Sequence, residues 1–111
     1  MRTESRVFVV DDDAAVRESL AMLLKLAGFA VVPYDSAKRF LEEAQPSAPD
    51  CLIADIRMPE MDGMELQQEL IRRKSTLPVI IVTGHGDVPL AVQAMKAGAV
   101  DFLEKPFARE P

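Results

Sequence analysis

The stretch Cys51-Leu-Ile-Ala-Asp-Ile-Arg-Met-Pro-Glu-Met-Asp-Gly63 decides how this chain folds. Apolar residues surround a single carboxylate, Asp55, and a continuous apolar run is typical of a strand buried on both faces of a sheet. Pro59 ends the run because its ring has no N–H to donate. Asp55 is therefore predicted at the carboxyl end of a central parallel strand, where ligands bind in open α/β sheets. A buried carboxylate needs a partner, so we expect a cationic group beside it.

Length and composition indicate one globular domain spanning residues 1–111. The formal net charge of −5 argues against direct binding of nucleic acid by this segment. No apolar run approaches the ~20 residues that a membrane span requires, and no signal peptide is recognisable. The single cysteine, Cys51, cannot form an internal disulfide, which fits a reducing cytoplasm. We therefore expect a cytoplasmic protein without membrane contacts.

Strand-like and helix-like segments alternate along the chain, which predicts right-handed βαβ units on a parallel sheet. The predicted strands are 7–10, 29–32 (stopped by Pro33), 51–56, 78–82 and 99–103. The helices between them are predicted from apolar stripes: Val16, Leu20, Leu23, Leu24 and Ala27 before a cap at Gly28; Ala37, Phe40, Leu41 and Ala44 after an N-cap at Ser36; Leu66, Leu70 and Ile71; and Val88, Ala91, Val92 and Met95 before Gly98.

The end of the chain predicts a missing helix. Only five residues follow Pro106, so the helix expected after the last strand is absent and the domain is expected to be truncated. Without it, Val100 or its neighbours Phe102 and Leu103 would face water. We therefore expect an unstable monomer, or a second copy of the chain covering this face.

Polar side chains follow four of the five predicted strands. Asp11 and Asp12 follow the first strand, Asp55 the third, Thr83 the fourth and Lys105 the fifth. Three carboxylates on one sheet edge repel each other, and a hard divalent cation such as Mg²⁺, or Mn²⁺ in its place, relieves this repulsion. A carboxylate beside a metal, a hydroxyl and an ammonium suits phosphoryl transfer to Asp55.

Four ordered blocks resemble the signature of two-component response-regulator receiver domains: Val9-Val-Asp-Asp12, Ile53-Ala-Asp-Ile-Arg-Met-Pro59, Val82-Thr-Gly84 and Glu104-Lys-Pro-Phe107. The run from Thr83 to Phe102 is similar to the FixJ-type branch, and the resemblance covers essentially the whole chain. It implies a flavodoxin-like (CheY-like), doubly wound, five-stranded parallel sheet of order 2-1-3-4-5. It also implies phosphorelay signalling by a regulatory domain rather than an enzyme: a sensor histidine kinase as donor, homodimerisation on phosphorylation, and a C-terminal DNA-binding output domain outside this chain.

The resemblance also implies roles for the residues around the predicted strand end. Asp55 corresponds to the phosphoacceptor, Asp12 to the main metal carboxylate and Asp11 to its support. The backbone carbonyl of Arg57 would complete the metal ligands that the protein provides. The side chain of Arg57, two residues after Asp55, matches a position that tunes how long the phosphoryl group survives.

Further roles are implied on the fourth and fifth strands. Thr83 would bind the phosphoryl group and switch on it, and Lys105 would pair with it. His85 resembles a second position that tunes phosphoryl lifetime, and the Lys105–Pro106 bond resembles one that is cis in this family. The chain departs from the family at Phe102, where Tyr is frequent: a phenylalanine can rotate inward behind Thr83 but has no hydroxyl to bond.

Other interpretations of the same residues stay open. The Asp11–Asp13 run is also typical of a helix N-cap, Asp55 of a turn before proline, Lys105 of a solvated charge and His85 of a loop hydrogen-bonding group. A haloacid-dehalogenase-type phosphatase also uses an aspartate nucleophile, but it is larger and needs a further acidic pair. A pseudo-receiver that serves only as an interaction module usually lacks part of the acidic cluster or the lysine.

Overall fold

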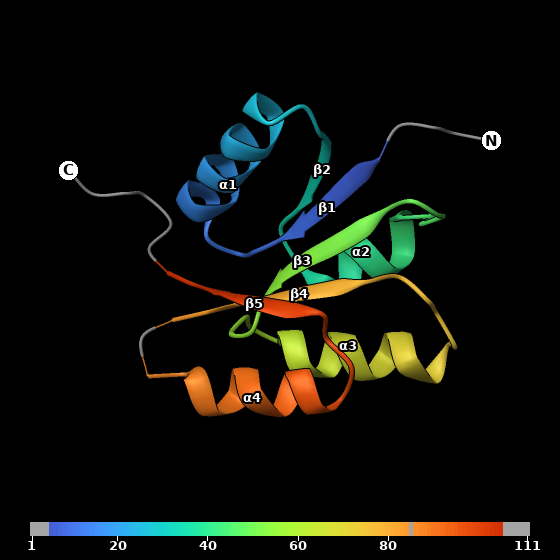
Figure 1. The fold of residues 1–111 in the computed structure, drawn as a ribbon, viewed down its shortest axis with the longest axis vertical. Coiled ribbons are helices and arrows are strands. Elements are labelled where there is room, and N and C mark those ends of the chain that lie inside the picture. Colours follow the sequence, from blue (N-terminus) through green and yellow to red (C-terminus); the bar gives the residue numbers. More distant parts are fainter. Residues whose placement is uncertain (1–4, 85, 106–111) are drawn as a thin grey trace.

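A computed structural model of the chain describes residues 5–84 and 86–105. Five strands alternate with four helices in this part of the chain (Figure 1). The strands are β1 (Arg6–Val10), β2 (Ala30–Tyr34), β3 (Cys51–Asp55), β4 (Val79–Thr83) and β5 (Asp101–Glu104). The helices are α1 (Ala14–Leu26), α2 (Ala37–Glu43), α3 (Gly63–Arg72) and α4 (Val88–Lys96).

The strands form one parallel sheet in the order β2-β1-β3-β4-β5, as the resemblance implied. In Figure 1, α1 lies on one face of the sheet, and α3 and α4 lie on the other. The larger buried cluster joins Phe8 and Leu52 of the sheet to Phe40 of α2, Leu66 of α3 and Ala94 of α4. Because β3 lies in the middle of the sheet, its last residue, Asp55, is held by packing from both sides.

Strand β2 is longer than predicted, since it continues through Pro33 to Tyr34. The expectation that Pro33 stops the strand is therefore wrong. Strand β2 lies at the edge of the sheet, and Pro33 is paired only with Val9 of β1. A proline is tolerated on an edge strand because its missing N–H has no ladder partner to lose.

The apolar stripes predicted for α1, α3 and α4 are partly wrong. Five of the side chains assigned to them are exposed: Leu23, Ala27, Ile71, Val92 and Met95. Two alanines outside those stripes, Ala21 and Ala94, are buried instead. Small residues let a helix approach the sheet closely, and the bulkier neighbours then lie beside the contact instead of in it.

The predicted helix ends agree with the structure. The Ser36 side chain accepts a hydrogen bond from the Arg39 amide at 3.1 Å and caps α2. Gly28 and Gly98 follow α1 and α4 with φ values of +98° and +120°. A positive φ is favourable for glycine, which explains why these two helices end there.

Apolar residues near β5 are open to water, as expected. Val100 is 56% exposed and Leu103 is 36% exposed, while Phe102 packs against the cluster on the α3–α4 side. The predicted truncation concerns residues 106–111, which lie outside the described residues. Among the helices described, none is both long and apolar enough to cross a membrane.

Candidate functional site

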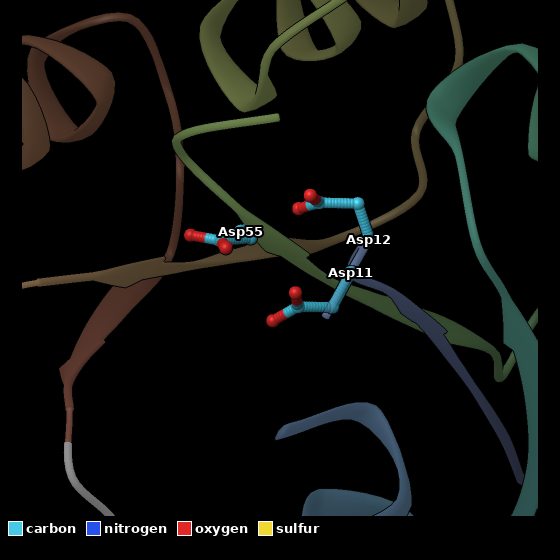
Figure 2. Close-up of side chains that lie close together, drawn as sticks. All are labelled: Asp11, Asp12 and Asp55. Carbon is cyan, nitrogen blue, oxygen red and sulfur yellow. The ribbon is translucent and has the colours of Figure 1, made fainter. Parts of the chain in front are cut away.

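Three carboxylates meet at the carboxyl ends of two adjacent inner strands, β1 and β3. Asp11 and Asp12 directly follow β1, and Asp55 is the last residue of β3. Each offers an oxygen within 4.8 Å of the others, and Figure 2 shows the three side chains extending into the same space. Asp11 and Asp55 are buried, whereas Asp12 is exposed. The parallel register of β1 and β3 causes this convergence, because both strands end at the same edge.

Lys105 is the cationic group that the buried Asp55 was expected to require. Its Nζ donates to Asp55 Oδ2 at 3.0 Å and lies 3.8 Å from Asp11 Oδ2. The Lys105 backbone N–H donates to the Thr83 carbonyl at 2.9 Å, which fixes the lysine just beyond β5. Burial disfavours the charged ammonium, but the hydrogen bond to Asp55 and the two carboxylate charges outweigh it and raise the pKa of Lys105.

The surroundings of Asp11 raise its pKa. Burial and the negative charge of Asp55 raise the pKa of Asp11 to about 6, against the ordinary 3.8. A backbone hydrogen bond from Asp13 at 2.9 Å and the charge of Lys105 oppose this rise. The metal-free site therefore holds a proton on Asp11 more tightly than an exposed carboxyl would.

This pKa predicts how acidity changes stability. The folded state binds the Asp11 proton more tightly than the unfolded state does, so the stability it confers is lost as pH rises from about 4 through about 6. At about 1.4 kcal/mol per pKa unit, the loss reaches up to about 3 kcal/mol. Asp11→Asn should therefore stabilise the metal-free protein at pH 7.5 relative to wild type, and much less at pH 4. Urea unfolding in chelator at both pH values tests this. An equal effect at the two values would contradict it.

The remaining predicted residues lie around the cluster. Thr83 ends β4 and is fully buried, with its hydroxyl donating to the Gly84 carbonyl at 3.3 Å. Phe102 pairs with Ile81 in the β4–β5 register and is half-buried. His85 and Pro106, with the cis bond implied for the latter, lie outside the described residues.

Sequence analysis missed the partner of the Arg57 side chain. The Arg57 backbone N–H donates to Asp55 Oδ1 at 3.3 Å. Its guanidinium makes a bidentate ion pair with Asp87, with nitrogen–oxygen distances of 2.9 Å and 2.8 Å. The Arg57 hydrogen bond lowers the pKa of Asp87. The two residues are 30 positions apart, and no spacing rule joins two loops that only the fold brings together.

Arg17 was also missed. It lies in the first turns of α1 and donates from Nη1 to the Asp11 carbonyl at 2.7 Å. This contact fixes the backbone of Asp11. A partly exposed arginine on a helix gives no sequence signal for such a contact.

The donor set suits a hard divalent cation. All three side chains offer carboxylate oxygens, and the exposed position of Asp12 leaves one side open to water. Mg²⁺ prefers oxygen ligands and keeps several waters. The residues present therefore fit a magnesium site.

Comparison with known proteins agrees with the resemblance that the sequence blocks indicate. The family profile described as "Response regulator receiver domain" matches residues 7–111. "Transcriptional regulatory protein FixJ" of Bradyrhizobium diazoefficiens is 52% identical over 107 residues, which cover 96% of this chain and 52% of that protein. The protein of the same name from Azorhizobium caulinodans is 56% identical over 101 residues, covering 91% of this chain and 48% of that protein.

A solved structure also matches. The crystal structure titled FixJ-N has a TM-score of 0.86 and 51% sequence identity, and the match covers 97% of this chain and 86% of that one. The chain spans about half the length of the two curated relatives.

Proposed function

Since the chain belongs to the response regulator receiver domain family and serves in phosphorelay signalling, we propose that Asp55 is the residue that accepts the phosphoryl group. One observation carries this assignment: the buried Asp55 carboxylate lies between two further carboxylates and the ammonium of Lys105, 3.0 Å away. An aspartate can act as a nucleophile toward phosphorus when the charge of the incoming group is neutralised.

In the proposed reaction, an Asp55 oxygen attacks the phosphorus of the donor. The bond from phosphorus to the donor's leaving atom breaks, and the leaving group takes the electron pair. Lys105 moves its positive charge from the free carboxylate to the phosphoryl oxygens, and Thr83 turns its hydroxyl toward them. The stable product is an aspartyl phosphate, formed once per chain.

Asp11, Asp12, Asp55 and the backbone carbonyl of Arg57 would hold Mg²⁺, or Mn²⁺ in its place. The chemistry that the ion supplies when bound is neutralisation of the carboxylates and of the phosphoryl oxygens. Asp12 suits the main role because its side chain is exposed and accessible to an incoming ion, whereas Asp11 is buried beside Lys105.

Thr83 and Phe102 suit the output step of the proposal. Thr83 is buried at the end of β4, and Phe102 lies on the adjacent strand, two register positions before Glu104, the residue that Thr83 faces. Movement of the hydroxyl toward the phosphoryl group leaves space into which the ring can rotate. We propose that this population shift reshapes the surface of α4 and β5 and favours a homodimer.

The partners follow from the same family membership. We propose a sensor histidine kinase as the phosphoryl donor and a DNA-binding output domain as the element controlled, because the similar proteins are named transcriptional regulatory proteins and are about twice as long as the matched segment. The free thiol of Cys51 suits a reducing cytoplasm, where we place the protein.

Intact mass spectrometry tests the function. With acetyl phosphate and Mg²⁺, the wild-type chain should gain one phosphoryl group and Asp55→Asn should gain none. Chelator should prevent the gain in wild type. Labelling that persists in the Asn variant would refute the assignment. Continuous phosphate release over many turnovers would favour the phosphatase alternative, and a wild type that never gains a phosphoryl group would favour the pseudo-receiver.

A further inference from the structure

The ion pair between Arg57 and Asp87 joins the phosphorylation site to helix α4. Arg57 follows Asp55 by two residues and bonds to it through its backbone, while Asp87 immediately precedes α4. Both oxygens of Asp87 accept from the guanidinium, at 2.8 Å and 2.9 Å. The Arg57 side chain is 69% exposed and that of Asp87 only 16%, so the arginine is the partner with room to move.

Asp87 does not cap its helix, although aspartate is well suited to do so. In the part of the chain that the structure describes, α1, α2 and α3 each begin with a residue whose side chain accepts a backbone N–H. These three residues are Asp13, Ser36 and Asp62, and their backbones are extended. Asp87 makes no such bond, and its ψ is 11°. Its carboxylate is bound to Arg57 instead.

Each member of the pair thus has an alternative partner. Asp87 could cap α4 through the Leu90 N–H, which now donates to the Asp87 backbone carbonyl at 3.0 Å; Pro89 has no N–H to offer. Arg57 could bind a phosphoryl group on Asp55, since a guanidinium fits phosphate oxygens in a bidentate manner and a dianion attracts it more strongly than one carboxylate does.

We propose that Asp87 is a positioning residue that holds the Arg57 guanidinium away from Asp55, and that a phosphoryl group competes for this guanidinium and releases Asp87 to cap α4. The inference rests on the proposed function, because it requires phosphorylation of Asp55. It adds an exchange of ion-pair partners that carries the phosphorylation state to the start of α4. Capping α4 would require the Asp87 backbone to become extended, like those of the other three capping residues. Asp87 lies four residues after Thr83, so this backbone change would act on the connection between β4 and α4 that Thr83 begins.

Two substitutions separate the halves of this exchange. Asp87→Asn and Asp87→Ala both free Arg57, but only asparagine retains a side-chain acceptor for the Leu90 N–H. Both variants should accelerate phosphorylation by acetyl phosphate about two- to fivefold, the range expected when an exposed competing ion pair is lost. The gain should shrink at high salt because the competition is electrostatic. In nitrogen-15 NMR, only the Asn variant should shift the Leu90 amide toward its position in phosphorylated wild type.

The matched control is Glu43→Gln, which removes the same charge from an ion pair within α2, where Arg39 Nε lies 3.1 Å from Glu43. It should leave the phosphorylation rate unchanged. In an Arg57→Gln background, Asp87→Asn should no longer accelerate the reaction, because the residue it positions is gone.

The inference is overturned if Asp87→Asn reacts like the control, or if it accelerates the reaction equally with and without Arg57. A Leu90 amide that responds identically in the Asn and Ala variants overturns the capping step. These results would leave phosphorylation of Asp55 intact. A wild-type protein that gains no phosphoryl group would instead overturn the proposed function, and this inference with it.

Discussion

Replacing Asp12 with alanine should weaken Mg²⁺ binding at least about tenfold, since losing even a supporting contact of a metal site typically has an effect of this size. Asp12 contributes one of the three carboxylates that converge within 4.8 Å, and its exposure gives an incoming hydrated ion access to it. Phosphorylation by acetyl phosphate should slow by a similar factor at low Mg²⁺. Isothermal titration calorimetry measures the binding directly.

The neighbouring Asp13 provides the control. Its carboxylate accepts hydrogen bonds from the Ala15 and Val16 amides and caps α1, so it is engaged away from the cluster. Asp13→Ala should lower the free energy of unfolding by about 1 kcal/mol and leave Mg²⁺ affinity unchanged. If both alanine variants weaken Mg²⁺ binding alike, the assignment of Asp12 as the main metal carboxylate is wrong.

Gly63→Ala should destabilise the fold by about 2–3 kcal/mol, the cost of forcing a methyl group into a tightly packed site. A Cβ at Gly63 would lie 2.5 Å from the Asp55 carbonyl oxygen and 2.8 Å from the Ile56 Cα. Both obstacles are backbone atoms, so no side chain can rotate away. The start of helix α3 would have to move away from β3 next to Asp55, the proposed phosphoacceptor.

Chemical denaturation of Gly63→Ala beside Gly84→Ala measures this cost. A Cβ at Gly84 would meet nothing nearer than an Asp87 oxygen at 3.9 Å, so this variant should lose much less stability. Phosphorylation of Gly63→Ala should also slow, because displacement of the Asp55 backbone displaces its carboxylate. Equal stability of the two variants would show that α3 can shift without cost.

The sequence contains enough information to place the acidic cluster. Apolar runs predict the inner strands, and the alternation with helices makes those strands parallel, so Asp11, Asp12 and Asp55 must reach one edge. The need of a buried carboxylate for a cation likewise predicts Lys105, which the structure places 3.0 Å from Asp55. These inferences hold because each depends on strand periodicity and burial, which are local properties of the chain.

Properties that depend on how elements meet could not be predicted in this way. Helical periodicity assigned Leu23 and Val92 to buried stripes, yet both are exposed because close contact with the sheet selects small residues such as Ala94. Likewise, the tolerance of Pro33 follows from the edge position of β2, which no short stretch of sequence reveals.

The ion pair of Arg57 with Asp87 shows the same limit at the site itself. Each residue lies in a loop, and a single charged residue in a loop is typical of the solvated surface. Their 2.8 Å contact exists only because β3 and β4 are neighbours and their following loops meet. Loop-to-loop contacts of this kind require the three-dimensional arrangement.

The most direct test of the proposed phosphorylation of Asp55 is to locate the phosphoryl group chemically in the wild-type chain. Borohydride reduces an aspartyl phosphate to homoserine, so treatment after incubation with acetyl phosphate and Mg²⁺ marks the modified residue for peptide sequencing by mass spectrometry. Phosphorylation of Asp55 predicts homoserine at position 55 and none when Mg²⁺ is chelated. Homoserine at position 11 or 12, or a label independent of Mg²⁺, would contradict it.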